Sequence, residues 1–145
     1  MQNEELKRVK LALEESRDRY ENLYEFAPVG YFSFTRVGRI VEANMTGAAL
    51  LGVPRAILIN RGFGSFVAPE NLDRWERHLV SVLQSEVSFG GDYEKQSCEL
   101  PLRRADGSTL HARLESVRLD PPAGSGAVPV IHTVLSDIAE RKRAE

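Results

Sequence analysis

The feature that most restricts the fold of this chain is the Asp106-Gly107 pair, which stands between two runs of β-forming residues. The runs cover 97–103 and 109–119, and Asp-Gly accepts the backbone angles that a tight hairpin turn needs. We therefore expect two antiparallel strands here. A third strand-like run, 128–136, follows the Pro- and Gly-rich stretch 120–126 and should extend the same sheet.

The first half of the sequence predicts a second, shorter hairpin. Two β-rich runs, 31–34 and 39–42, flank a turn at Val37-Gly38. Directly after them, Asn44 is suited to cap a short helix over 45–51.

A longer internal helix is expected over about 70–86, opened by Pro69. One face of it is apolar and consists of Leu72, Trp75, Leu79, Val82 and Leu83. Before this helix we expect a helical turn over 54–59 and a loop over 62–66. This order of elements predicts an α+β fold, in which helices cover one face of a five-stranded antiparallel sheet.

Residues 4–26 predict an amphipathic helix with a narrow apolar stripe, and Pro28 should end it. The stripe has the heptad spacing of a coiled coil. Its positions are Leu6, Val9, Leu13, Ser16, Tyr20 and Leu23. We expect residues 1–27 to form a dimerisation helix in which the apolar positions pair two chains. A single helix lying across its own domain is the alternative.

The last nine residues, 137–145, predict the start of a second connecting helix. Asp137 is a good N-cap residue, and Glu140 stands at capping-box spacing after it. No Gly, Asn or Pro follows to close the helix. We therefore expect a folded domain over 28–136 that passes a helix on to a partner domain.

Composition excludes several classes of function. A net charge of −2 gives no basic field for nucleic acid or an anionic membrane, and no apolar run reaches the ~18 residues that span a bilayer. The acidic N-terminus does not resemble a secretory signal, and the single cysteine, Cys98, cannot form an internal disulfide. The sequence contains none of the hydrolase, P-loop or zinc-protease motifs, so we expect a cytoplasmic, non-catalytic domain with no metal site.

Five short stretches of the chain carry a resemblance to a known family. They are 26–31 (FAPVGY), 38–44 (GRIVEAN), 50–53 (LLGV), 102–108 (LRRADGS) and 136–142 (SDIAERK). In these stretches the chain resembles the PAS domains of bacterial signalling proteins. The resemblance runs from about Tyr20 to the end, and the closing stretch is its most specific part. It implies a PAS fold with a cavity between sheet and helices, and flanking helices that pack in a parallel homodimer. It also implies that Asp137, Glu140 and Arg141 begin a signalling helix joined to a histidine kinase, a diguanylate cyclase or another PAS domain.

The candidate ligand-binding residues are aromatic or histidine. They are Phe32, Phe34, Phe66, Trp75, His78 and His132. The aromatic side chains could wall a cavity or could fill the core themselves. His132 shares a strand face with Val130 and Val134, so it either points into the cavity, lies in the core or lies on the outer face of the sheet.

The cofactor is left open by the sequence. His78 is expected at the edge of the apolar helix face, partly exposed, and in haem-binding relatives a histidine of this helix ligates the iron. A flavin–cysteine adduct is not expected, because the cysteine motif of light-sensing relatives is absent and 62–66 holds no cysteine. Cys98 is expected to be a small apolar filler.

Together these features predict a sensory module that binds a small ligand and passes a conformational change through its flanking helices. The parent protein is expected to be a signalling protein, in the first place a histidine kinase. The alternative is a ligand-free module for dimerisation and relay.

Overall fold

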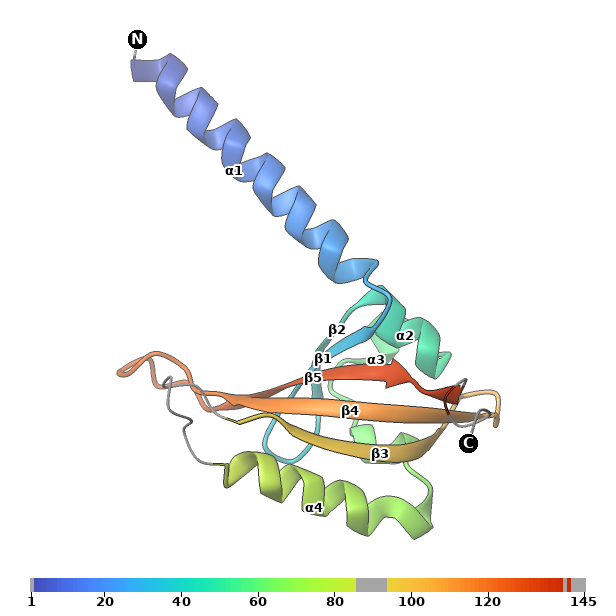
Figure 1. Ribbon diagram of the computed structural model, residues 1–145. Helices are drawn as coiled ribbons and strands as arrows, with labels where there is room; N and C mark the ends of the chain where they lie inside the picture. The colour runs from blue at the N-terminus through green and yellow to red at the C-terminus, as the bar shows by residue number, and fades with distance from the viewer. Residues whose placement is uncertain (1, 86–93, 140, 142–145) are drawn as a thin grey trace.

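The computed structural model describes residues 2–85, 94–139 and 141 (Figure 1), and its centre is one antiparallel sheet. The strands follow the order β2-β1-β5-β4-β3, and every neighbouring pair is antiparallel. Their bounds are β1 Gly30–Phe34, β2 Ile40–Ala43, β3 Gln96–Arg103, β4 Thr109–Leu119 and β5 Val130–Asp137. The predicted five-stranded antiparallel sheet is thus confirmed.

Helices occupy the connection between the two hairpins. They are α2 Met45–Leu51, α3 Arg55–Leu58 and α4 Leu72–Leu83, with two short 3-10 helices, η1 Phe63–Phe66 and η2 Pro69–Asn71. Two local predictions were wrong. The expected loop over 62–66 is the 3-10 turn η1, and Pro69 opens η2, so that α4 begins three residues later than the proline. The last residue of the predicted long helix, Glu86, lies outside the described residues.

The β3–β4 hairpin forms as its turn chemistry predicts. Gly107 has φ +88°, a conformation that other L residues rarely adopt. Asp106 Oδ1 accepts hydrogen bonds from the backbone N–H and the hydroxyl of Ser108, at 2.9 and 2.6 Å. The register then places Arg103 opposite Thr109, and β3 pairs along its whole length with residues 109–116 of β4.

The core lies between one face of the sheet and the helices α2, α3, η1 and α4, which lie on the same side of the sheet. Alternate residues of the long strands point into it, so Leu110, Ala112 and Leu114 of β4 are buried while their neighbours are more exposed. Within the described part of the chain, none of these four helices lies on the other face of the sheet.

The N-terminal helix, α1 Gln2–Glu25, projects away from the body of the domain (Figure 1). Its predicted seam residues are largely exposed, with Leu6 at 68%, Leu13 at 67% and Leu23 at 72%. The alternative of a helix laid across its own domain is therefore not what the structure shows. Within residues 2–85, 94–139 and 141, no helix has both the length and the apolar character to cross a membrane.

Candidate functional site

The side chain of Asn44 joins α1 to the rest of the domain. Its Oδ1 accepts hydrogen bonds from the backbone N–H of Tyr31 (2.9 Å) and of Gly47 (2.8 Å). Its Nδ2 donates to the carbonyl oxygens of Tyr24 (2.6 Å) and Val29 (3.2 Å). The residue is fully buried, and both acceptor sites and both donors of the amide are used. One side chain thus fixes the end of α1 to β1 and to the first turn of α2.

Two further contacts hold the same end of α1. The Thr46 hydroxyl of α2 donates to the carbonyl oxygen of Ala27 at 2.6 Å, and Arg55 of α3 forms an ion pair with Glu25. The junction therefore rests mainly on polar contacts of fixed geometry.

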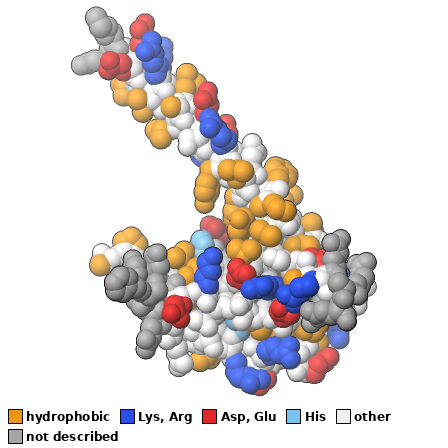
Figure 2. Space-filling model, in the orientation of Figure 1, with side chains coloured by type: hydrophobic (Ala, Val, Ile, Leu, Met, Phe, Trp, Pro, Cys, Tyr) orange, Lys and Arg blue, Asp and Glu red, His pale blue; other side chains and the backbone are white. Residues whose placement is uncertain are grey.

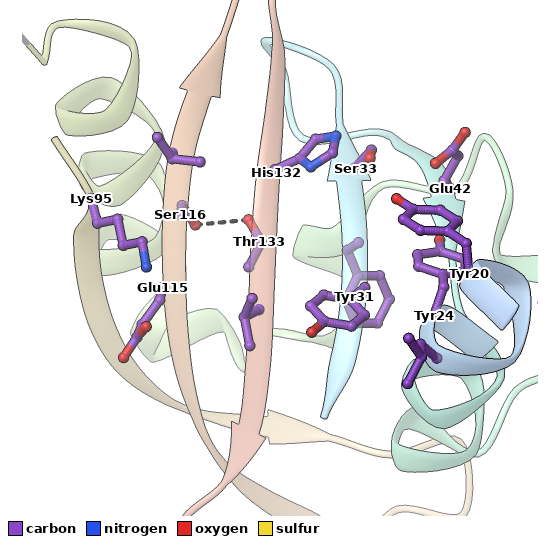
Figure 3. A pocket seen from close by; sticks show the side chains of 14 residues that line it. Tyr20, Tyr24, Tyr31, Ser33, Glu42, Lys95, Glu115, Ser116, His132 and Thr133 are labelled. Carbon is purple, nitrogen blue, oxygen red and sulfur yellow. Dashed lines mark hydrogen bonds between the residues drawn. The ribbon is translucent and has the colours of Figure 1, made fainter. Parts of the chain in front are cut away.

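An open groove of about 470 Å³ lies beside this junction, on the outer face of the sheet (Figure 3). Tyr20, Leu23 and Tyr24 form its α1 wall, and the Tyr24 ring stacks on the Tyr31 ring with the centroids 5.8 Å apart. The residues that complete its lining are Phe32, Ser33, Glu42, Lys95, Glu115, Ser116, Val117, His132, Thr133 and Val134. Figure 2 shows hydrophobic side chains gathered where α1 meets the body.

Tyr24, at the α1 end of the groove, is half-buried and lies near two carboxylates. Burial and then the carboxylates of Glu42 and Glu25 raise the pKa of Tyr24 to about 12, against a smaller opposing effect of Arg55. Lys95 and Glu115 lie at the other side of the groove (Figure 3).

His132 lies in this groove and not between the sheet and the helices. It pairs with Ser33 across β5 and β1, and its side chain is exposed. The predicted alternation with Val130 and Val134 is correct, but the face they share is the outer one. Of the placements that the sequence left open for His132, the outer face is therefore the one observed.

Aromatic side chains fill the space in which a cavity was expected. The ring centroids of Phe63 lie 5.0 Å from Phe34 and 4.8 Å from Trp75, and those of Phe34 and Trp75 are 5.6 Å apart. Phe32 and Phe66 pack on the edges of this cluster, and all five residues are at most 3% exposed. The four predicted aromatic site residues are thus brought together as core.

A hydrogen-bonded chain of three buried polar side chains connects α4 through β4 to β5. His78 Nε2 lies 2.9 Å from Ser116 Oγ, which lies 2.7 Å from Thr133 Oγ1. These side chains are 5%, 1% and 2% exposed, and burial lowers the pKa of His78, so its neutral form is favoured. The expectation of a partly exposed His78 was wrong, because β3 and β4 pack against α4 and cover the edge of its apolar face.

This arrangement does not fit haem. His78 Nε2, the nitrogen nearest the sheet, is already hydrogen-bonded to Ser116, and Phe34, Phe63 and Trp75 occupy the adjacent core. An iron ligand on α4 needs a free imidazole nitrogen facing an open pocket.

The outgoing segment leaves the sheet beside the start of β1, because Leu135 near the end of β5 stands opposite Gly30 in the register. Asp137 is the last residue of β5, and its Oδ1 accepts a hydrogen bond from the N–H of Ala139 at 2.9 Å. Ile138 donates to the carbonyl oxygen of His111 at 2.9 Å, and Arg141 forms an ion pair with Glu99 at 2.6 Å. Glu140, the third predicted relay residue, lies outside the described residues.

Comparison with solved structures identifies the fold. The PAS domain of an HTR-like protein from Haloarcula marismortui has a TM-score of 0.72 at 23% identity, covering 91% of this chain and 99% of that one. This is a PAS fold.

A PAS domain from a LuxR-family transcriptional regulator of Burkholderia thailandensis, in complex with ethanol, has a TM-score of 0.60 at 23% identity and covers 83% of this chain and 97% of that one. A domain of a sensor histidine kinase/response regulator from Geobacter sulfurreducens has a TM-score of 0.64 at 20% identity, covering 86% and 96%. No family model and no curated protein matches the sequence.

The site of this PAS fold contains residues that were not singled out from the sequence. Asn44 was expected only to cap α2, although it can also bond a carbonyl of a preceding segment. Ser116 and Thr133 were missed, yet a signal was present. Each is a hydroxyl residue at a position whose neighbours two residues away, such as Leu114 and Leu135, face the core.

Proposed function

We propose that this PAS domain is a sensory signalling module that transmits a displacement of α1 to the outgoing segment. One observation carries the proposal: β1, to which Asn44 attaches α1, is the hydrogen-bonded neighbour of β5, which leads out of the domain. Tyr31 donates its N–H to Asn44 and stands opposite Val134 in the register. A shift at the end of α1 therefore has a short, fully bonded route to the outgoing strand.

The packed core favours relay over a ligand held between sheet and helices. Phe34, Phe63 and Trp75 contact one another where such a ligand would lie. The module then takes its input from the segment or domain to which α1 connects. Its two signalling states differ in the arrangement of the helices and not in whether a ligand occupies the core. A histidine kinase is the proposed effector, in line with the neighbour from Geobacter sulfurreducens, and a cytoplasmic location follows from that proposal.

We further propose that α1 pairs with α1 of a second chain in a parallel homodimer. The seam residues Leu6, Val9, Leu13, Tyr20 and Leu23 are exposed in the single chain, and each is at an a or d position. Burying such a stripe against an identical stripe removes apolar surface from water, whereas the charged remainder of the helix stays solvated.

Sedimentation of the chain with Leu13→Lys and Leu23→Lys tests the dimer. The double variant should sediment as a monomer at concentrations where the unaltered chain is dimeric. Leu11→Lys is the matched control, because Leu11 is also exposed on α1 at 58% but lies off the seam. An unchanged mass in the double variant would contradict pairing through this seam.

Hydrogen exchange tests the relay itself. Loss of the Asn44 attachment should change the protection of amides in β5 and in Ile138, which lie far from Asn44 along the chain. The proposal would be wrong if changed exchange were confined to α1 and α2.

A further inference from the structure

A second concave site lies on the other side of the domain, between α4 and the first half of β3. Its volume is about 270 Å³. It is lined by Arg74, Arg77, His78, Ser81, Gln96, Ser97 and Cys98. None of these lining residues carries a carboxylate, two are always cationic, and the serines and Gln96 supply neutral hydrogen-bond donors. Such a set of side chains suits an oxyanion.

Both arginines are placed to serve such a ligand. Arg74 Nη1 donates to the carbonyl oxygen of Glu99 at 3.1 Å, which holds its guanidinium against β3 and leaves further N–H groups for a ligand. Arg77 forms an ion pair with Asp73 one turn earlier, at 2.8 Å, and both side chains are more than two-thirds exposed. An exposed pair of this kind is weak, so Arg77 can exchange Asp73 for a bound oxyanion at little cost.

His78 connects this site to the outgoing strand. It belongs to the lining of the α4–β3 site and is also the first member of the hydrogen-bonded chain through Ser116 to Thr133. Thr133 lies in β5, four residues before Asp137. A negative charge placed beside the imidazole changes the hydrogen-bonding preference of His78, and the adjoining hydroxyl groups must adjust to it.

We propose that the α4–β3 site binds a small oxyanion, a phosphate or a carboxylate group, and that His78, Ser116 and Thr133 carry its occupancy to β5. This input goes beyond the relay proposed above, since it enters the domain from the side of α4 and not through α1. Binding at the site can be measured whether or not the relay operates.

Cys98 provides a built-in probe, because it lines the site and is the single cysteine of the chain. Its alkylation by iodoacetamide at pH 8 should slow down as inorganic phosphate is added, and again with malonate as the carboxylate probe. Sodium chloride at equal ionic strength should leave the rate unchanged. Which of the two anions protects at lower concentration identifies the preferred group.

Arg77→Ala should weaken this protection about tenfold or more, since a guanidinium–oxyanion contact is charge-assisted. Arg17→Ala is the matched control: Arg17 also forms an exposed i,i+4 ion pair on a helix, with Glu21, but lies far from the site. In Arg17→Ala, the anions should protect Cys98 as strongly as they do in the unaltered chain. The site would be overturned if chloride protected Cys98 as well as phosphate does, or if Arg77→Ala and Arg17→Ala lost protection equally. Either result would show only non-specific screening of charge.

The connection to β5 has its own readout. Phosphate should shift the amide resonances of Thr133 and Leu135 in the unaltered chain and not in Arg77→Ala. Protection of Cys98 without any shift at Thr133 would overturn the connection and would leave the relay through α1 unaffected, because that relay does not use His78.

Discussion

Replacing Asn44 by alanine should weaken the whole domain and release α1 in particular. The substitution removes four hydrogen bonds at once, to the N–H groups of Tyr31 and Gly47 and to the carbonyl oxygens of Tyr24 and Val29. A typical net contribution of about 1 kcal/mol for each bond gives an upper figure near 4 kcal/mol. Three of the four bonds, the two from Nδ2 and the one from Tyr31, are only part-buried, so water replaces some of what is lost, and we expect a decrease of about 3 kcal/mol.

Urea unfolding followed by circular dichroism measures this decrease, with hydrogen exchange as the local readout. Amides in the last turn of α1 should lose protection more than those of β4, because α1 is held by few other contacts. Asn71→Ala is the matched control. Asn71 is also an asparagine at the N-cap of a helix, α4, but its side chain makes no capping hydrogen bond. That variant should change the free energy of unfolding by less than about 0.5 kcal/mol.

Asn44→Asp distinguishes the two bonds that the side-chain oxygen accepts from the two that Nδ2 donates to carbonyl oxygens. The carboxylate can still accept from Tyr31 and Gly47, but it cannot donate, and it places a negative charge against the carbonyl oxygens of Tyr24 and Val29. It should therefore free α1 while α2 stays capped. If Asn44→Ala cost no more than Asn71→Ala, or if α1 kept its protection in Asn44→Asp, the central role given to this side chain would be refuted.

Two further substitutions test the packing of the core. Gly47→Ala should cost about 1–3 kcal/mol in urea unfolding, because its Cβ would lie 2.8 Å from Cζ of Phe32; Gly62→Ala, with nothing within 4 Å, should be close to neutral and serves as the control. Burial lowers the pKa of His78, so the unfolded chain binds the proton first and the free energy of unfolding should fall as pH drops below about 6.5. In His78→Gln that part of the pH dependence should be missing, and an identical slope in both proteins would contradict the assignment.

The parts of the fold that the sequence predicted well are those with local causes. The turn of the β3–β4 hairpin is set by Asp106 and Gly107, and α2 is capped by Asn44 and by Gly52, which has φ +72°. Alternation likewise predicted which residues share a face of β5. It could not predict which face is buried, because that depends on where the helices pack, and so His132 remained open between the core and the outer surface.

Burial at the edge of a helix was the second feature that could not be predicted from the sequence. His78 lies at the margin of the apolar face of α4, where periodicity alone favours partial exposure. Its polar partner in the core is Ser116, which is 38 residues away in the sequence and supplies the hydrogen bond that a buried imidazole needs. A hydroxyl residue at a core position of a strand is therefore a useful sequence signal for a polar group on the opposite element.

The way α1 is attached bears on the signalling role proposed for it. Most of its apolar residues are exposed, so the domain gains little from its position, and its end is fixed by a few polar contacts around Asn44. Hydrogen bonds weaken steeply when their angles leave the preferred range, and the Asn44 amide has no spare donor or acceptor with which to compensate. A change of pairing along α1 that rotates its last turn must therefore break the bond to Tyr24 or carry Asn44 with it. Because Asn44 is also bonded to Tyr31, the second outcome moves β1, and β1 is paired with β5.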